Sequence, residues 1–271
     1  MKFSIVIVTL NAGENLLKTI HSIKKQKYTD YEIIIKDGGS DDNSISTVTT
    51  DNQTKVYIEK DSGIYDAMNQ ALDNVSGDLI IFLNSGDTFY NDNVLSTIDD
   101  FISKVKGYEP GTIFYGDCYT VNRNSYVKYP DVFDDYTCFT KTLCHQATVY
   151  TSNLFYKRKF NLNYKIASDF EYYVHSYKHG VKFVHIPIVM VNYLGGGASE
   201  IYINRKKSIN ESEIILKENF SEIQFKKIKK KMLLTGLLIK RWLAGSKLLY
   251  KPYSNLAGWL NRIRDNNKEG I

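Results

Sequence analysis

The chain has 271 residues, which is enough for one large domain or for a domain with an appendage. Its apolar fraction of 43% is ordinary for a soluble protein with a hydrophobic core, and its apolar runs are shorter than the ~18–20 residues of a membrane span. The three cysteines, Cys118, Cys138 and Cys144, form no C-x-x-C pair. Their odd number argues against a disulfide framework or a zinc site and favours a reducing cytoplasm.

The formal net charge of +5 is unevenly distributed. Of the 35 basic residues, eleven lie between Lys226 and Arg264, a stretch without Asp or Glu. The remaining 24 basic and 30 acidic residues give the rest of the chain a net charge of −6. An acidic body with a basic tail predicts an anionic partner for the tail.

Strands and helices alternate over about the first hundred residues, and the short apolar run at the start reads as a strand rather than a signal peptide. We expect strands over 3–8, 31–36, 56–58 and 79–83, and helices from 15, over 44–50, from 62 to 75 and over 94–105. This alternation predicts a parallel sheet with helices on both faces. The strand over 79–83 is apolar throughout, as central strands of such sheets are.

The pattern changes after about residue 110. We expect a hairpin over 112–121 and 126–129, a strand over 145–150, a helix over 169–179, a strand over 181–193 and an amphipathic helix over 205–219. The tail begins near Ser221.

Three of the predicted strands end in turns that carry a carboxylate, namely Asp37, Asp61 and Asp87. In open α/β sheets ligands bind at this edge, and carboxylates gathered there repel each other unless a cation binds. Mg²⁺ or Mn²⁺ together with a phosphate-bearing ligand would meet that need. Asp and Gly are also common turn formers, but three such turns together favour the ligand-binding interpretation.

Four motifs follow one another in the first ninety or so residues: FSIVIVTLNAG, YEIIIKDGGSDD, DSGIYDAMNQAL and GDLIIFLNSGD. They resemble the nucleotide-sugar domain of the family 2 inverting glycosyltransferases, and CHQATVY and ASDFEYYV extend the resemblance to about residue 200. Within the family the chain looks most like bacterial enzymes that build O-antigen, capsule or exopolysaccharide units.

The resemblance implies the GT-A fold, an α/β, Rossmann-like architecture with a mostly parallel central sheet and helices on both faces. Residues 1–110 would form the nucleotide-sugar half and residues 111–220 the acceptor half of one domain. Residues 221–271 would form a basic helical tail. The donor would be a UDP-sugar and the cofactor Mn²⁺ or Mg²⁺.

The resemblance also assigns roles to individual residues. Asp87 would bind the metal, although Asn84 and Gly86 stand where carboxylates are usual in the family's D-x-D turn. Asp37 would bind uracil or its ribose. The other residues expected to contact the nucleotide-sugar are Thr9, Asn11, Asp66, Asn69, Asn84, Ser85 and His145.

Asp169 falls where the family carries its catalytic base. An inverting transfer needs one carboxylate to take the proton of the acceptor hydroxyl. Asp169 could instead be a helix N-cap together with Ser168, and Glu171 is the fallback base. His145 could equally be structural. Gly195 to Gly197 with Ser199 resemble the family's flexible loop over donor and acceptor, although an ordinary connection has the same composition.

Residues 226–264 interleave apolar and basic side chains and resemble an interfacial helix on an anionic membrane. The alternatives are a helical hairpin packed on the domain and a nucleic-acid-binding segment, and the apolar content argues against the latter. Together these features predict a cytoplasmic, peripheral enzyme whose acceptor is a lipid-linked glycan. The rival functions are a sugar nucleotidyltransferase, which would need a Gly-rich loop with Arg and Lys after the first strand, and a membrane-binding module without activity.

Overall fold

Strand β1 (Phe3–Thr9) lies at the centre of the N-terminal half, and all seven of its residues are buried. It pairs in parallel with β2 (Tyr31–Asp37) on one side and with β4 (Leu79–Phe82) on the other. β2 and β4 are buried along their whole length as well, as strands covered on both faces must be. β3 (Thr54–Ile58) adds a parallel, partly exposed edge.

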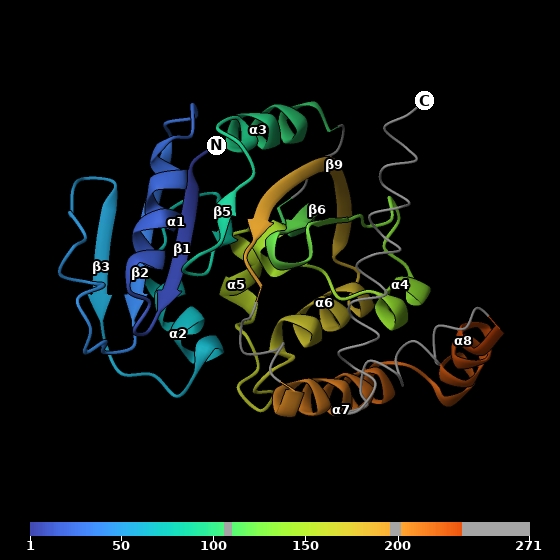
Figure 1. Ribbon diagram of the computed structural model, residues 1–271. Coiled ribbons are helices and arrows are strands. Elements are labelled where there is room, and N and C mark those ends of the chain that lie inside the picture. Colours follow the sequence, from blue (N-terminus) through green and yellow to red (C-terminus); the bar gives the residue numbers. More distant parts are fainter. Residues whose placement is uncertain (106–109, 196–201, 235–271) are drawn as a thin grey trace.

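The computed structural model describes residues 1–105, 110–195 and 202–234 (Figure 1). In that part of the chain the sheet order is β3-β2-β1-β4-β8-β6-β9-β5. β4 meets β8 (Thr148–Thr151) in antiparallel pairing, and β8 meets β6 (Thr112–Thr120) in the same way. The remaining strands are β9 (Lys182–Tyr193), parallel to β6, β5 (Thr88–Phe89), antiparallel to β9, and β7 (Ser125–Val127), antiparallel to β6.

The result is a mixed α/β fold with helices packed around a curled sheet (Figure 1). In the N-terminal half, α2 packs against β1 and β2, and α1 packs against β5. In the second half, α6 packs against α7, and α8 contacts both α7 and α4. The helices are α1 (Glu14–Lys24), α2 (Ile64–Ala71), α3 (Val94–Lys104), α4 (Asp135–Thr140), α5 (Asn153–Lys157), α6 (Ser168–Lys178), α7 (Tyr202–Asn219) and α8 (Glu222–Leu234).

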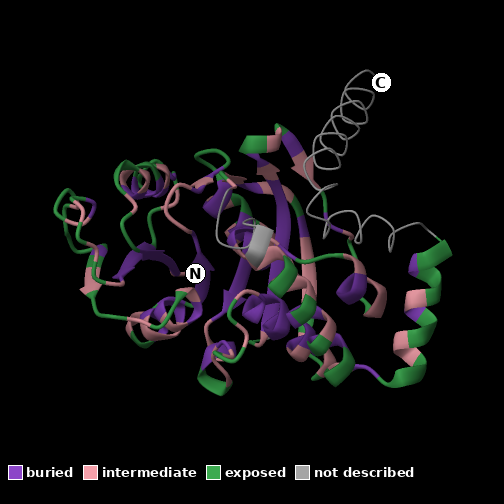
Figure 2. Ribbon diagram, turned by 60° about the horizontal axis from the view of Figure 1, so that its bottom comes forward, coloured by how far each residue is buried: buried purple, intermediate pink, exposed green. Residues whose placement is uncertain are grey.

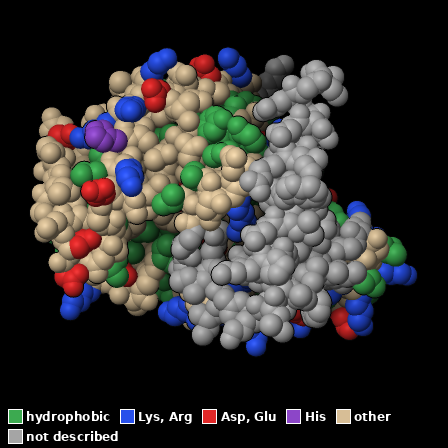
Figure 3. All heavy atoms as spheres, viewed as in Figure 1, with side chains coloured by type: hydrophobic (Ala, Val, Ile, Leu, Met, Phe, Trp, Pro, Cys, Tyr) green, Lys and Arg blue, Asp and Glu red, His purple; other side chains and the backbone are tan. Residues whose placement is uncertain are grey.

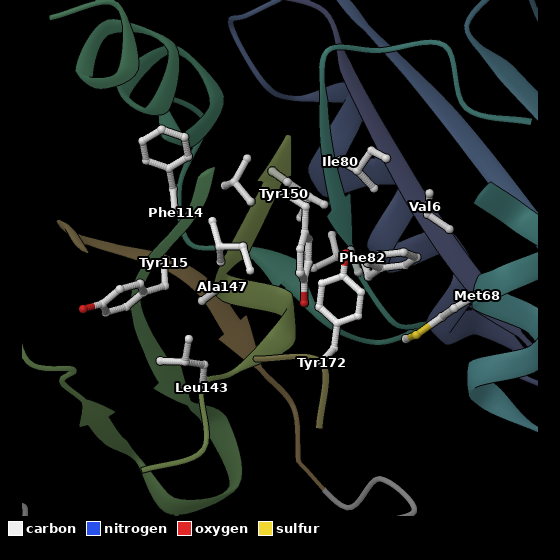
Figure 4. Packing of buried hydrophobic residues seen from close by; sticks show 14 of the residues in the cluster. Val6, Met68, Ile80, Phe82, Phe114, Tyr115, Leu143, Ala147, Tyr150 and Tyr172 are labelled. Atoms are coloured by element: carbon white, nitrogen blue, oxygen red, sulfur yellow. The ribbon is translucent and has the colours of Figure 1, made fainter. Parts of the chain in front are cut away.

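Aromatic side chains join the two halves where β4 meets β8. Figure 4 shows Phe82 of β4 beside Tyr150 of β8 and Tyr172 of α6. The rings of Phe82 and Tyr150 meet edge to face at 5.9 Å, and the Tyr150 hydroxyl lies 2.7 Å from that of Tyr173. Figure 2 shows that burial is concentrated on the central strands, whereas α8 carries many exposed residues. The two halves therefore share one hydrophobic core.

Two predicted elements are wrong. Residues 44–50 form a turn instead of a helix, because the Asp42 carboxylate binds the backbone N–H of Ser44 at 3.0 Å and also its hydroxyl, an arrangement that competes with a helix. Residues His145–Ala147 form the single 3₁₀ turn η3, so the predicted strand begins only at Thr148. Of the predicted tail, residues 235–271 lie outside the described part, and so do residues 196–201, which include most of the predicted glycine-rich loop.

Candidate active site

A cavity of about 490 Å³ lies beyond the carboxyl end of β4. Its wall is built from the turn after β4, from η3 and β6, and from the first turn of α6 and one face of α7. Among the residues named from the sequence, it brings together Asn84, Ser85, Asp87, His145 and Asp169. Three basic side chains also line it: Arg123, Lys165 and Arg205.

Asp87 is buried, with an exposed fraction of 4%. Its Oδ2 accepts a hydrogen bond from Nε2 of Gln146 at 2.8 Å, and its Oδ1 accepts one from the backbone N–H of Leu194 at 2.8 Å. Burial raises the pKa of the Asp87 carboxyl, and these hydrogen bonds and His145 partly oppose that rise. Each oxygen keeps a lone pair for a further ligand.

The turn before Asp87 requires glycine. Gly86 has a φ of +100°, and a Cβ there would lie 2.9 Å from Cδ2 of Leu194. The backbone of this turn therefore explains why position 86 lacks the carboxylate expected of a D-x-D motif. Ser85 in the same turn donates its hydroxyl to that of Thr9 at 3.0 Å, which ties the turn to the end of β1.

The side chain of His145 joins this turn to α6. Asn84 Nδ2 lies 3.1 Å from His145 Nε2, and His145 Nδ1 lies 3.5 Å from Oδ2 of Asp169. When Asn84 donates to Nε2, the imidazole hydrogen sits on Nδ1 and faces the carboxylate. The other amide atom of Asn84, Oδ1, is buried and has no hydrogen-bond partner.

The carboxylate of Asp169 lies in the first turn of α6, two residues beyond the N-cap Ala167. Its Oδ1 accepts hydrogen bonds from the hydroxyl of Tyr65 and the backbone N–H of Phe170, each at 2.8 Å. Burial, and then the charge of Asp169, raise the pKa of Tyr65 well above its usual range, so the phenol stays a hydrogen donor. The N-cap alternative for Asp169 is wrong, because Ala167 takes that position.

Glu171, the alternative candidate for the base, contacts Arg158 and not the cavity. Glu171 is buried and accepts a hydrogen bond of 2.6 Å from Nη2 of Arg158, and it is not part of the described cavity wall. Of the two carboxylates in this turn of α6, only Asp169 reaches the cavity.

The remaining residues predicted to bind the nucleotide lie outside the described wall of this cavity. Asn11 Oδ1 accepts a hydrogen bond from the N–H of Asp41 at 3.0 Å, and Asp37 Oδ2 accepts one from the N–H of Ser40 at 2.8 Å. These contacts place the loops after β1 and β2 side by side at the same edge of the sheet.

Two further residues that were predicted to contact the nucleotide-sugar, Asp66 and Asn69, make hydrogen bonds within the protein. Asp66 accepts hydrogen bonds from the N–H and the hydroxyl of Ser62, and so fixes the start of α2. Asn69 makes a pair of 2.9 Å hydrogen bonds with the backbone of Phe160. Nδ2 and Oδ1 of the Asn69 amide therefore both help to hold the segment before α6 against α2.

A buried lysine that the sequence analysis overlooked gathers two of the three acidic strand ends. Lys36 is 1% exposed, and its Nζ donates to the backbone carbonyls of Asp37 and Glu59 and lies 3.4 Å from Oδ2 of Asp61. The cation beside the Asp61 carboxylate is thus part of the chain, whereas the Asp37 carboxylate is bound by the N–H groups of Gly39 and Ser40. The one available signal was a Lys directly after the apolar run Ile33 to Ile35.

The described residues contain no group of three or more His, Cys, Asp or Glu side chains that could hold a metal alone. A Mg²⁺ or Mn²⁺ ion that shares its ligands with a substrate phosphate needs only one or two protein oxygens. The Asp87 carboxylate and the unpartnered Oδ1 of Asn84 fit that smaller requirement.

Comparison with known proteins gives one family and several similar folds. The family model for glycosyl transferase family 2 matches residues 4–169. A "PGL/p-HBAD biosynthesis glycosyltransferase" of Mycobacterium bovis is 30% identical over 209 residues, which cover 73% of this chain and 80% of that protein.

Two solved structures show the same architecture at low identity. Residues 1–349 of S. aureus TarS in complex with UDP-GlcNAc align with a TM-score of 0.63 at 15% identity, covering 90% of this chain and 79% of that one. Another structure of S. aureus TarS is matched over 44% of its chain and 92% of this one. The mannosyltransferase PcManGT of Pyrobaculum calidifontis, in complex with GDP-Man and Mn²⁺, aligns with a TM-score of 0.65 at 14% identity, covering 100% and 88%.

Proposed function

The chain belongs to glycosyl transferase family 2 and has the GT-A fold, and we propose that it catalyses the inverting transfer of a sugar from a UDP-sugar to an acceptor hydroxyl. The observation that carries the proposal is the position of Asp169. It shares one cavity with the turn Asn84 to Asp87, and Tyr65 and His145 orient its two oxygens.

Asp169 is the general base in this proposal. Tyr65 and Phe170 both donate to Oδ1, so Oδ2 is the oxygen left to receive the proton of the acceptor hydroxyl. Removing that proton while the hydroxyl oxygen attacks the anomeric carbon from the face opposite the nucleotide inverts the configuration. His145 Nδ1, 3.5 Å from Oδ2, keeps the carboxylate turned toward the cavity.

Asp87 and the Oδ1 of Asn84 would hold the Mn²⁺ or Mg²⁺ ion. Such an ion, when bound, would supply positive charge to the departing nucleoside diphosphate. Desolvation raises the pKa of the buried Asp87 carboxyl. A cation beside it would favour the ionised form of this group. The Mn²⁺ in the PcManGT structure supports a divalent ion at this kind of site.

The donor is a UDP-sugar, either a hexose or an N-acetylhexosamine, in this proposal. The TarS complexes with UDP-GlcNAc and UDP support a uridine nucleotide. The polar loops after β1 and β2 and the start of α2 would surround the nucleotide, with Thr9, Asn11, Asp37, Asp66 and Asn69 as the predicted contributors.

The acceptor is a lipid-linked glycan, and the protein works at the inner face of the plasma membrane in surface-polysaccharide assembly. None of the helices in the described ranges is long and apolar enough to cross a bilayer. Helix α8 instead exposes lysines beside Ile223, Leu233 and Leu234, which are 81%, 58% and 80% exposed. Figure 3 shows basic and hydrophobic side chains together at the lower right, over α8.

The test is transfer from a panel of UDP-sugars to a sugar-diphosphate-lipid analogue, with Mn²⁺, Mg²⁺ or a chelator. We expect transfer that stops on metal removal and a product whose anomeric configuration is inverted by NMR. Asp169→Asn should lower kcat by at least 10²-fold. A retained configuration, or near-normal turnover of Asp169→Asn, would contradict the proposal.

A further inference from the structure

A buried carboxylate from α7 holds the backbone immediately before Asp169. Glu211 is 8% exposed and receives three backbone hydrogen bonds. Its Oε1 accepts from the N–H of Lys165 at 3.1 Å, and its Oε2 accepts from the N–H groups of Ile166 and Ala167 at 2.9 Å each.

Lys165 and Ile166 precede α6 and Ala167 is its N-cap, so the N–H groups of these three residues have no partner within the helix. Ala167 has no side-chain acceptor for the first turn, and the N–H of Phe170 is bound by Asp169 Oδ1 instead. A carboxylate at a helix N-terminus also interacts favourably with the helix dipole. Glu211 therefore fixes the direction in which the chain enters α6.

The same segment also contacts Tyr65 of α2, whose hydroxyl binds the Asp169 carboxylate. The backbone carbonyl of Ile166 lies 2.9 Å from the Tyr65 hydroxyl, which also reaches Asp169 Oδ1 at 2.8 Å. Lys165, Ile166 and Ala167 line the cavity themselves. A shift of this segment would move the Tyr65 hydroxyl and the Asp169 carboxylate relative to each other.

We propose that Glu211 is a positioning residue that sets the Asp169 carboxylate for proton removal from the acceptor. The inference rests on the proposed role of Asp169 as the base. Ser208 and Ser212, one turn of α7 before Glu211 and directly after it, line the same cavity. Helix α7 thus forms part of the cavity wall and, through Glu211, also fixes the position of Asp169 relative to that wall.

The test compares Glu211→Gln, Glu211→Asp and the control Glu218→Gln. Glu218 lies on the same helix and binds the hydroxyl of Tyr164 at 2.7 Å, next to the segment that Glu211 holds, but it is exposed and contacts a side chain only. In Glu211→Gln one amide N–H₂ must face a backbone N–H. We expect kcat to fall about tenfold or more, with the donor KM unchanged. Glu211→Asp keeps the charge and should recover part of kcat, and Glu218→Gln should match wild type.

A double variant separates positioning from a general loss of structure. If Glu211 acts through Asp169, then adding Glu211→Gln to Asp169→Asn should lower kcat no further. Amide hydrogen exchange at residues 165–167 should become faster in Glu211→Gln and stay unchanged in Glu218→Gln. A wild-type kcat in Glu211→Gln, or an additional loss in the double variant, would overturn the inference while leaving the proposed function intact.

The remaining outcomes are also decisive. If Glu211→Gln does not fold, Glu211→Asp carries the test, and an unchanged kcat in that variant overturns the inference. If wild type transfers no sugar, or Asp169→Asn stays active, the proposed function fails first and the role of Glu211 falls with it.

Discussion

The hydroxyl of Tyr65 is where α2 of the N-terminal half meets α6 of the second half. Tyr65 is buried and contacts both Asp169 and the backbone of Ile166. Since burial raises its pKa, the phenol remains a neutral donor across the working range of a glycosyltransferase. A single hydrogen bond thus links the segment predicted to bind the nucleotide to the proposed base.

Tyr65→Phe should remove this hydrogen bond and leave the ring packing in place. We expect kcat to fall by roughly tenfold and the free energy of unfolding to fall by about 1–3 kcal/mol, because a buried acceptor loses its donor. Steady-state kinetics and chemical unfolding measure the two effects. The matched control is Tyr115→Phe, whose hydroxyl donates to the carbonyl of Pro130 at 2.7 Å and which is not itself part of the described cavity wall. It should lose stability and keep kcat, and equal kcat losses in both variants would contradict the role of Tyr65.

His175, on the last turn of α6, gives the fold a dependence on pH. Burial, and then the nearby Arg158 and His179, lower its pKa to about 4. An unfolded His has a pKa of about 6.5. Between these values the unfolded chain binds a proton that the folded chain does not, so stability falls as pH drops from about 6.5 toward 4.

His175→Gln should lose less stability than wild type on acidification. At pH 5 the difference should be roughly 1 kcal/mol once screening by solvent is allowed for. Thermal unfolding at pH 7.5 and at pH 5 measures it. His21→Gln, at an exposed histidine of α1, is the control and should follow wild type. Parallel curves for wild type and His175→Gln would show that His175 does not contribute.

At the scale of elements, the turn after β4 depends on the left-handed backbone of Gly86. Gly86→Ala should cost about 1–2 kcal/mol for the backbone and more for the contact of its Cβ with Leu194. Because Asp87 follows directly, the variant should also bind Mn²⁺ more weakly, as calorimetry in the presence of UDP can measure. Gly180→Ala is a matched control, since Gly180 has a φ of +81° but open space around its Cβ. Equal stability losses and equal Mn²⁺ affinity in both variants would contradict this account.

The parallel strands of the N-terminal half could be predicted from sequence because each follows from a local apolar run and a polar turn. Short helices such as α4 and α5 span six and five residues, too few for a periodicity to be visible. The helix predicted over 44–50 is replaced by a turn because of a side-chain contact of Asp42. A hydrophobic pattern contains no information about such a contact.

The candidate site also has a part that could be predicted from the sequence and a part that could not. The family motifs predicted that Asn84, Ser85, Asp87, His145 and Asp169 belong together, and the cavity brings these residues together. The groups that hold them were not predicted: Gln146 binds Asp87, Tyr65 binds Asp169, and Glu211 binds the start of α6. Each of these contacts joins residues far apart in the chain or on different elements, so only the folded structure reveals them.

At the scale of the whole molecule, the acidic body and the basic tail differ in charge. Helix α8 buries Ile228 and Met232 against the body and exposes Lys226, Lys227, Lys230 and Lys231. A helix held on one side and basic on the other can lie on an anionic surface without unfolding from the body.

Replacing these four lysines of α8 with glutamine should weaken binding to anionic vesicles. Each lysine near such a surface contributes roughly 1 kcal/mol, so the loss should be several kcal/mol at low salt and smaller at high salt. Co-sedimentation with vesicles that contain phosphatidylserine measures it. The control replaces four exposed lysines of the body, Lys18, Lys25, Lys27 and Lys182. Equal binding of both variants, or no binding by wild type, would contradict a membrane-facing α8.

The pairing of β4 with β8 places residues of the candidate site before any substrate binds. One continuous set of backbone hydrogen bonds runs from β3 to β5, and it carries the turn of Asp87 and, through β8, the strand that follows His145. The relative position of Asp87 and His145 is thereby set during folding, and His145 Nδ1 lies 3.5 Å from Oδ2 of Asp169. In the proposed reaction, donor and acceptor would meet groups that are already in place, so little of their binding energy would be needed to assemble them.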